Sequence, residues 1–307
     1  MLGLVVAEND PAAIAASIAR MGWRVAIVLV FPITLVTLLD TLGWRFAFAH
    51  DRVGLATLLP ARLAGEAFNL TTPTASLGGE AVKTWLLQGR VPIDEAVSSV
   101  IVAKTTITIG QGLLLLLGVI LAWTSLPVDS RILRAMECLV GLEVLALGGF
   151  VIVQTRGLAA RGARMLSRLG LSRFEGHATV GRIDEALATF YRKRPFRLAL
   201  SLACHFFAWL LGAVEAWLIL ALLGTPVSLV TATVIEAFGM GIRFATFLVP
   251  GSVGVLEGGY AATFAALGLG STAGVSFSLV RRIREAVWIA LGLLAFALMR
   301  SARPATD

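Results

Sequence analysis

The chain alternates between long apolar runs and short polar segments. Six of the apolar runs have the length that a helix needs to cross a bilayer, roughly 20 residues. They lie at about 23–42, 96–123, 137–155, 198–222, 227–249 and 273–299. Because no segment between them is large enough to form a soluble domain of its own, the pattern predicts an all-α, polytopic membrane protein.

Two further segments, residues 53–91 and 247–270, are apolar but broken by proline and glycine. The positions expected to act as hinges are Pro73, Gly78, Gly79, Pro250, Gly251 and Gly254. Both segments carry ionisable residues, which a lipid-facing helix would not hold. A broken or re-entrant helix that lines a cavity can hold them. With these two segments, six to eight helical segments are expected, and whether the two span or re-enter is left open.

The two broken segments share a layout. The residues that recur at the same spacing are Pro73, Glu80 and Lys104 in the first segment, and Pro250, Glu257 and Arg281 in the second. Paired broken helices in corresponding halves point to a substrate site in transporters. The layout therefore favours an internal duplication with halves at about 20–155 and 198–300, either parallel or inverted.

Composition and charge fit a single integral membrane domain over residues 1–307. Mean hydropathy is +0.86 and only 15% of the residues are charged, against about 25% in soluble domains. The net charge of +7 is concentrated in the segment 156–197. The positive-inside rule places that segment and the C-terminus in the cytoplasm, and it argues against nucleic-acid binding as the source of the positive charge. The sequence contains no metal-binding or cofactor-binding motif, so no cofactor is expected.

Ionisable residues inside apolar sequence are candidate functional residues by default. The first group consists of Arg62, Glu66, Asn69, Glu80, Lys83 and Lys104. A half-helix that starts at the glycine pair would direct its N–H groups at an anion, such as a lipid head group, with Lys83 one turn further on. The alternative is that Glu80 caps this helix and pairs with Lys83.

The second group consists of Arg243, Glu257, Arg281, Arg282, Arg284 and Glu285. Guanidinium groups bind phosphate in a bidentate manner, so the arginines suit a phosphate-bearing ligand. Arg281 and Glu285 have the spacing of a helical ion pair. The alternative is a cytoplasmic helix end with arginines that extend to the membrane surface, which is the role expected for Arg282 in either case.

Four other ionisable residues lie inside the apolar runs. Asp40 is expected to reach the membrane interface, and His205 to be a packed or interfacial residue. Glu215 and Glu236 are expected to face the interior, where each would pair with an arginine or bind a proton.

The two broken segments carry a resemblance to a known family. RLAGEAFNLTTPTASLGGEAVKTWLL resembles the first signature of the flippase-like family that includes the membrane region of lysylphosphatidylglycerol synthases. FLVPGSVGVLEGGYAATFAALGLG, followed by SFSLVRRIREAVWIALGLLA, resembles the second signature, most of all in the branch associated with hopanoid biosynthesis. LTTPTASLGG is richer in hydroxyl groups than the family's glycine-rich form.

The resemblance implies a multi-pass lipid-handling protein of the bacterial cytoplasmic membrane, with about eight helical segments around a lipid-accessible cavity. The head-group-binding residues it implies are Glu66, Asn69, Glu80, Lys83, Lys104, Arg243, Glu257, Arg281 and Arg284. Full-length synthases of that family add a soluble aminoacyl-transferase domain. Since residues 1–307 contain no such domain, no aminoacyl transfer is expected from them.

Three functions remain open at this stage. The first is a lipid translocase for a hopanoid, a glycolipid or an anionic phospholipid. The second is a membrane-embedded lipid-modifying transferase in which Glu80 and Glu257 do acid–base work. The third is a scaffold for lipid-synthesis enzymes that dock on segment 156–197.

Overall fold

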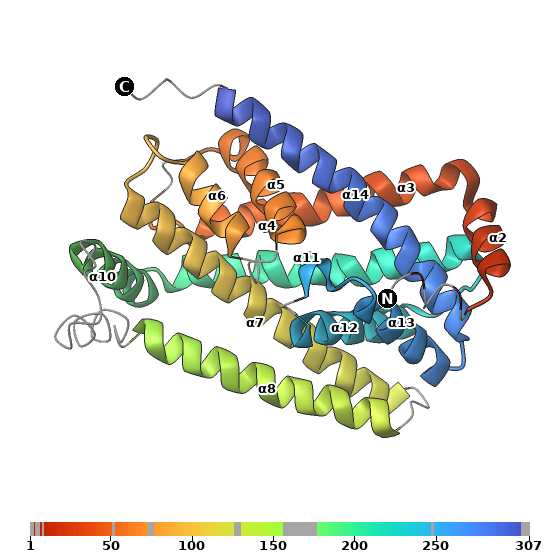
Figure 1. Cartoon of the computed structure of the whole chain (residues 1–307). Helices are drawn as coiled ribbons and strands as arrows, with labels where there is room; N and C mark the ends of the chain where they lie inside the picture. The colour runs from red at the N-terminus through yellow and green to blue at the C-terminus, as the bar shows by residue number, and fades with distance from the viewer. Residues whose placement is uncertain are drawn as a thin grey trace.

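The described part of the chain is entirely helical apart from turns and one isolated bridge. The computed structural model describes residues 3, 7, 9–50, 53–72, 77–125, 130–155, 177–246 and 249–301. The α-helices are α2 (Pro11–Met21), α3 (Val25–Val30), α4 (Ile33–Ala47), α5 (Leu55–Thr71), α6 (Gly78–Leu86), α7 (Ile93–Ser125), α8 (Ser130–Thr155), α10 (His177–Lys193), α11 (Pro195–Leu223), α12 (Leu229–Ala245), α13 (Val255–Ala266) and α14 (Ser271–Ser301). Two short 3-10 helices are η1 (Gly22–Arg24) and η2 (Pro250–Ser252). The prediction of an all-α fold is confirmed (Figure 1).

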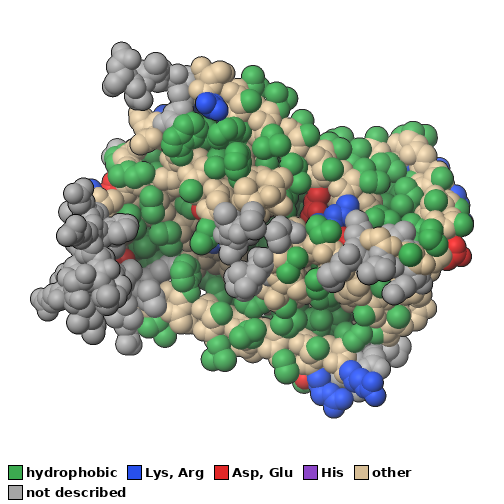
Figure 2. Space-filling view, in the orientation of Figure 1, with side chains coloured by type: hydrophobic (Ala, Val, Ile, Leu, Met, Phe, Trp, Pro, Cys, Tyr) green, Lys and Arg blue, Asp and Glu red, His purple; other side chains and the backbone are tan. Residues whose placement is uncertain are grey.

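Within the described residues, four helical stretches are long and apolar enough to cross a membrane. They are Pro11–Ala47, Ile93–Ser125, Arg131–Ile152 and Pro195–Leu223. Helix α14 is long enough as well, but its first half carries arginines and a glutamate. Hydrophobic side chains are spread over the face seen in Figure 2, where charged side chains are few, and many large hydrophobic side chains are exposed, as expected of a lipid-facing surface. The chain is a multi-pass membrane protein.

The first predicted span is interrupted at its proline. Helix α3 ends at Val30 and α4 begins at Ile33, on either side of Phe31 and Pro32. Proline lacks the N–H that a continuous helix needs at this point. The predicted span at about 23–42 is therefore divided between two helices.

Both broken segments re-enter rather than span. Ala47, at the end of α4, and Ala96, at the start of α7, belong to one buried cluster, so α5 and α6 leave and return to the same end of the molecule. Leu223, at the end of α11, likewise shares a cluster with Leu267 and Ala273, at the start of α14. Segment 53–91 thus forms a hairpin of two short helices, α5 and α6, inside the protein. The second hairpin pairs α12 with α13, so the run at about 227–249, which was predicted to span the membrane, turns back inside the protein instead.

The two hairpins enter from opposite ends. Arg197, near the start of α11, donates a hydrogen bond to the carbonyl of Arg45, near the end of α4, and His205 reaches Asp40. Helices α4 and α11 are therefore antiparallel. It follows that the hairpin after α4 and the hairpin after α11 point toward each other from the two ends, as Figure 1 shows.

Helices α4 to α7 of the first half and α11 to α14 of the second follow in the same order with inverted topology, whereas α8 has no counterpart in the described part of the second half. The shift in residue number that takes Glu80 to Glu257 also takes the first residue of α6, Gly78, to that of α13, Val255. The first helix of each hairpin packs against the long last helix of the other repeat: α5 packs against α14, and α12 packs against α7. Inverted repeats with discontinuous helices are a common architecture of secondary transporters.

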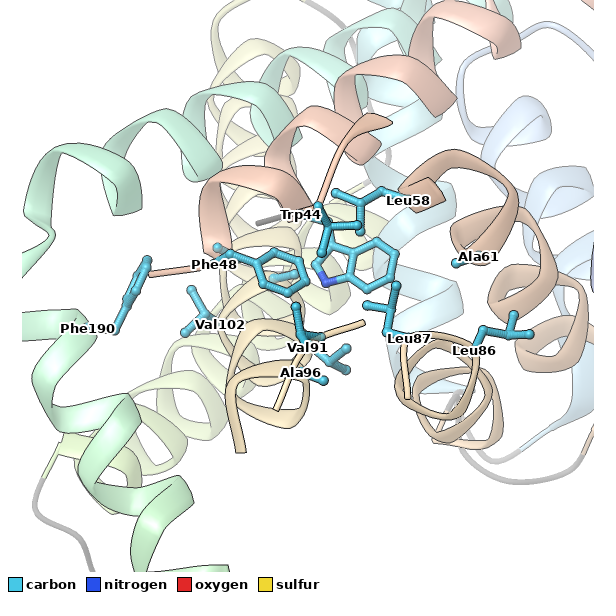
Figure 3. Packing of buried hydrophobic residues seen from close by; sticks show 14 of the residues in the cluster. Trp44, Phe48, Leu58, Ala61, Leu86, Leu87, Val91, Ala96, Val102 and Phe190 are labelled. Carbon is cyan, nitrogen blue, oxygen red and sulfur yellow. The ribbon is translucent and has the colours of Figure 1, made fainter. Parts of the chain in front are cut away.

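The end of the molecule that carries α10 has its own apolar core. Trp44, Phe48 and Leu58 pack there with residues of α6 and α7, and Phe190 of α10 covers the cluster (Figure 3). We call this the α10 end. The start of α11 and the last turns of α14 lie at the same end, and α2 lies at the opposite one. The packing fixes the hairpin of the first half against the rest of the molecule.

Part of the basic segment lies outside the described residues. The arginines concerned are Arg156, Arg161, Arg164, Arg168 and Arg173. The remainder forms α10 and the beginning of α11. Arg182, Arg192 and Lys193 give this part of the α10 end a positive charge.

Candidate functional site

Two adjoining cavities lie between the halves. One has a volume of about 220 Å³ and the other of about 480 Å³. Both are lined by Asp40, Arg62, Glu66, Trp209 and Arg243, so they share a wall. The tips of the two hairpins contribute to this region, since Gly251 of η2 approaches the carbonyl of Leu70 in α5. The cavities therefore occupy the place where the inverted repeats meet.

Charged side chains of both signs line these cavities. They are Asp40, Arg62, Glu66, Glu80, Lys83, Lys104, Glu215, Glu236, Arg243, Arg281, Arg284 and Glu285. The structure thus brings the two groups of candidate residues together. Glu257 is the predicted head-group residue that lies on neither wall.

Glu80 organises the charges of the first half. Its carboxylate lies 2.9 Å from Lys83 Nζ and 3.9 Å from Lys104 Nζ, and it accepts a hydrogen bond of 3.2 Å from Asn69 Nδ2. Lys83 is buried, and its ammonium also lies 5.7 Å from the ring centroid of Trp44, within the range of a cation–π contact. Glu80 and Lys83 therefore form the ion pair that was the alternative in the sequence analysis.

Asp40 lies in the interior, so the expectation that it reaches the membrane interface is wrong. Its carboxylate pairs with Arg62 of α5 and lies 2.9 Å from Nδ1 of His205 in α11. The His205 ring is fully buried and leaves no room for a side chain at position 43, where Gly43 lies. A buried carboxylate is stable only with such partners.

Arg281 connects four helices. Its guanidinium lies 2.6 Å from a carboxylate oxygen of Glu236 in α12 and 3.4 Å from one of Glu215 in α11, and it donates to Tyr260 Oη of α13 at 2.9 Å. Arg284 lies 2.5 Å from the same Glu215. The expectation that Glu215 and Glu236 face inward and pair with arginine is confirmed. The alternative of arginines that extend to the membrane surface is wrong for Arg281, because it is buried.

Arg282 is a second linking residue, contrary to the surface role expected from the sequence. It lies 2.6 Å from Glu257 and 2.7 Å from Glu285. Glu285 also lies 2.8 Å from Arg243 of α12. The helical pair predicted between Arg281 and Glu285 is not formed, because Arg281 turns to α11 and α12 while Glu285 turns to Arg282 and Arg243.

Three charged side chains remain accessible from the cavities. The side chains of Lys104 and Arg243 are 37% and 32% exposed, far more than those of their partners Glu80 and Glu285. Glu66 is exposed, lines both cavities, and makes no ion pair or hydrogen bond with a described residue. Among the described residues, Glu66 and Lys104 can contact a ligand without the loss of a close ion pair, whereas Arg243 is accessible but is also held 2.8 Å from Glu285.

Gly79 allows the first hairpin to close. A Cβ atom at this position would lie 1.9 Å from the carbonyl oxygen of Gly65, so only glycine fits. The N–H of Gly79 donates to Asn69 Oδ1 at 2.8 Å. Helix α6 begins at Gly78 with Glu80 in its first turn, and this arrangement does not favour the anion site predicted there.

The second hairpin turns at glycine as well. Gly251 and Gly254 adopt φ angles of 56° and 85°, which glycine accommodates without strain. Glu257 accepts a hydrogen bond of 2.5 Å from the N–H of Gly254, so it closes the start of α13 as a cap. Pro250 opens η2 as expected, whereas Pro73 lies outside the described residues.

The residues that sequence reasoning placed elsewhere share one signal. Asp40 and Arg282 are both polar groups inside or next to apolar runs, whereas His205 is packed in the interior as one of its two expected roles requires. That position is itself the indication of an interior role in a membrane protein. Within the described residues, no group of histidine, cysteine, aspartate and glutamate side chains could hold a metal ion.

Comparison with known proteins identifies the family. No curated protein and no solved structure matches this chain. Residues 1–297 match the family described as the lysylphosphatidylglycerol synthase TM region. The match covers both hairpins and every helix that lines the cavities except the last turn of α14. The chain therefore belongs to the lysylphosphatidylglycerol synthase transmembrane-region family, whose members are membrane proteins that handle lipids.

Proposed function

We propose that this protein moves a lipid between the two leaflets of the membrane. The head group would pass through the cavities between the halves while the acyl or terpenoid tails stay in the bilayer. The observation that carries the proposal is the meeting of two inverted re-entrant hairpins at adjoining cavities lined by charged side chains. Inverted repeats support alternating access around a fixed site.

The charged lining addresses the main barrier to lipid movement. A polar head group that enters the bilayer loses its hydration, and burial of an unpaired charge costs several kcal/mol or more. The cavity walls offer both cationic and anionic side chains in exchange. Because most of them are already paired, the empty site avoids the same penalty.

A phosphate-bearing head group fits the accessible side chains best. Lys104 and Arg243 are the exposed cations, and both line the larger cavity together with Glu66. Ammonium and guanidinium groups are strong phosphate donors. This favours a phospholipid over a glycolipid or a hopanoid among the candidate substrates. Because the second hairpin resembles the branch associated with hopanoid biosynthesis, a polyterpenoid lipid is a further candidate to be tested.

Orientation follows from the charge at one end. The α10 end carries Arg182, Arg192 and Lys193, together with Arg300 in the last turns of α14. By the positive-inside rule this end would face the cytoplasm, in the cytoplasmic membrane of a bacterium. The protein would then exchange lipid between the cytoplasmic and outer leaflets of that membrane.

The transferase hypothesis receives less support. Acid–base catalysis needs a carboxyl group that reaches the substrate. Glu257 is fully buried, pairs with Arg282 and caps α13, and Glu80 is held by Lys83. The scaffold hypothesis rests on segment 156–197, part of which lies outside the described residues.

The test is leaflet-resolved lipidomics on cells that lack the protein and are complemented with variants. Glu66→Gln and Arg243→Gln alter the accessible groups, and Arg300→Gln is the control at an exposed position. Translocation is supported if the total amount of a lipid stays constant in cells that lack the protein while its distribution between leaflets changes. Glu66→Gln and Arg243→Gln should fail to restore the normal distribution. Disappearance of a lipid with accumulation of its precursor contradicts it and supports the transferase. Normal function of both variants, with loss only when the basic segment is neutralised, supports the scaffold.

A further inference from the structure

Glu143 lies in the middle of α8, which is otherwise a lipid-exposed helix. The exposed side chains of α8 include Leu142, Val144 and Leu145, whereas the side chain of Glu143 is 1% exposed. Neither carboxylate oxygen of Glu143 has a hydrogen-bond partner among the described residues. An ionisable side chain on the inner face of a membrane helix is a candidate functional group.

The surroundings of Glu143 are apolar and closely packed. Gly112 of α7 faces it, and a Cβ atom at that glycine would lie 3.3 Å from the Glu143 carboxyl carbon. One and two turns before Glu143 on α8, Leu139 and Met136 lie against Gly241 of α12. The helix–helix contact thus encloses a carboxyl group without providing a partner for it.

The ionisable groups on the helices packed against α8 are engaged elsewhere or lie at its ends. On α7, Lys104 is near Glu80, and on α12, Glu236 and Arg243 pair with residues of α14. Helix α10 packs on α8 at the α10 end. The remaining ionisable side chains described on these helices are Asp94 and Glu95 on α7, Arg182, Asp184, Glu185, Tyr191, Arg192 and Lys193 on α10, and Arg131, Arg134, Glu137 and Cys138 on α8. No counter-charge near Glu143 therefore balances its ionised form within the described residues.

The position favours a neutral carboxyl group. An unpaired carboxylate in an apolar site carries a desolvation cost of several kcal/mol, which a bound proton removes. A route for the proton is close by. Gln111, next to Gly112, and Ala146, one turn from Glu143, both line the larger cavity. One layer of side chains thus separates Glu143 from the space assigned to the lipid head group.

We propose that Glu143 is a proton-binding site that exchanges protons with water in the larger cavity. A hydronium ion in the cavity gives its proton to a carboxylate oxygen of Glu143, and the reverse transfer returns the proton to water. If the proposed lipid translocation is correct, on which this second step rests, the site makes lipid movement respond to a proton gradient. A proton gradient would then be one source of energy for the transport.

Infrared spectroscopy of the purified protein tests proton binding without reference to lipid movement. Lowering the pH protonates exposed carboxylates in every variant, so the test is the difference between their spectra. As the pH is lowered, the wild type should gain a protonated-carboxyl band, in addition to that of the exposed groups, that is missing in Glu143→Gln. Glu137→Gln, on the same helix but hydrogen-bonded to Trp123 at an exposed position, should keep the band. A band that persists in Glu143→Gln, or one that does not respond to pH in the wild type, overturns the proposal.

A second variant covers loss of folding. Glu143→Leu fills the site with an apolar side chain and should unfold at the same or a higher temperature while it also lacks the band, because it removes an unpaired polar group. A clear decrease in its unfolding temperature would indicate that Glu143 has a structural partner and would count against the proposal.

Vesicles with a pH difference across the membrane test the coupling. Lipid movement by the wild type should change when the gradient is imposed, and movement by Glu143→Gln should not. If the wild type moves lipid at the same rate with and without the gradient, the coupling is wrong and the translocase proposal stands. If no lipid moves in any sample while the infrared band is present, the translocase proposal fails and the proton site stands.

Discussion

Arg281 is held in place by three other helices. Its guanidinium donates hydrogen bonds to Glu215 of α11, Glu236 of α12 and Tyr260 of α13. Each contact is made across the interior, and those with Glu215 and Glu236 join elements far apart in sequence. Such pairs stabilise little relative to an apolar core, but the loss of one partner leaves the others buried and unpaired. The residue therefore determines how α14 packs against the rest of the second half.

Replacement of Arg281 by Gln is expected to destabilise the protein strongly. The change leaves Glu236 without its guanidinium partner, and the loss of one member of a buried pair costs about 3–5 kcal/mol. Thermal unfolding in detergent measures it, with Arg300→Gln as the exposed control on the same helix. The double variant Arg281→Gln/Glu236→Gln should lose less stability than the two single changes added together. Additive losses would show that the two residues do not interact.

Glu66→Gln is expected to separate function from stability. Because Glu66 is exposed to the cavities and makes no pair with a described residue, its loss should leave the unfolding temperature unchanged. Lipid movement should slow, since the cavity loses its accessible anionic group. A large decrease in unfolding temperature together with normal lipid movement would contradict the assignment of Glu66 to the site.

At the scale of elements, the re-entrant hairpins depend on close approach of helices. Gly79 of α6 lies against the Gly65 carbonyl of α5, and Gly259 of α13 lies against Ile242 of α12. Each hairpin is thus a pair of short helices in contact through a glycine. Neither α5 nor α12, at 17 residues each, reaches the roughly 20 residues of a full membrane span.

Gly79→Ala is expected to disturb the first hairpin. The added methyl group overlaps a backbone oxygen that cannot move as a side chain would, and such overpacking costs typically ~1–3 kcal/mol. Gly258→Ala, in the equivalent helix α13, meets nothing within 4 Å and should be neutral or stabilising. Comparison of their unfolding temperatures checks this. Equal effects would indicate that the α5–α6 contact differs from the one described.

Much of the helical framework could be predicted from the sequence, but the partners of the charged residues could not. The apolar runs, the proline and glycine breaks and the spacing shared by Glu80 and Glu257 predicted two broken segments and favoured their repetition, but left open whether the segments re-enter, and α12 was predicted as a full span. Helical spacing alone paired Arg281 with Glu285, whereas the structure pairs Arg281 with Glu236 of another helix. Long-range packing decides such contacts, and one sequence contains no direct signal for it.

At the scale of the whole molecule, the structure shows that the two halves are inverted, whereas the residue spacing alone allowed either a parallel or an inverted repeat. The antiparallel contact of α4 with α11 gives each half the opposite direction through the membrane. Charged groups from both halves then face the same cavities. The arrangement provides equivalent hairpins from either side of the membrane, as alternating access requires.

Cysteine labelling from one side of the membrane tests this topology. In a background with Cys138 and Cys204 replaced by serine, cysteines at Ser125 and Thr225 should react from one side, because these positions lie at the α2 end. Cysteines at Lys193 and Ser301, at the α10 end, should react from the other. Labelling of all four from the same side would contradict the inverted arrangement.

The central claim is most directly tested by lipid movement in vesicles that contain only the purified protein. A phospholipid with a fluorescent tail label is placed in both leaflets, and a reductant added outside bleaches the labels that reach the outer leaflet. Vesicles with the wild type should lose nearly all fluorescence, those with Glu66→Gln or Arg243→Gln should lose the second half more slowly, and those without protein should stop at about half because only the outer leaflet is exposed. If wild-type vesicles also stop at half for phospholipid, glycolipid and hopanoid probes, with and without a pH difference, the account of this protein as a lipid translocase is contradicted.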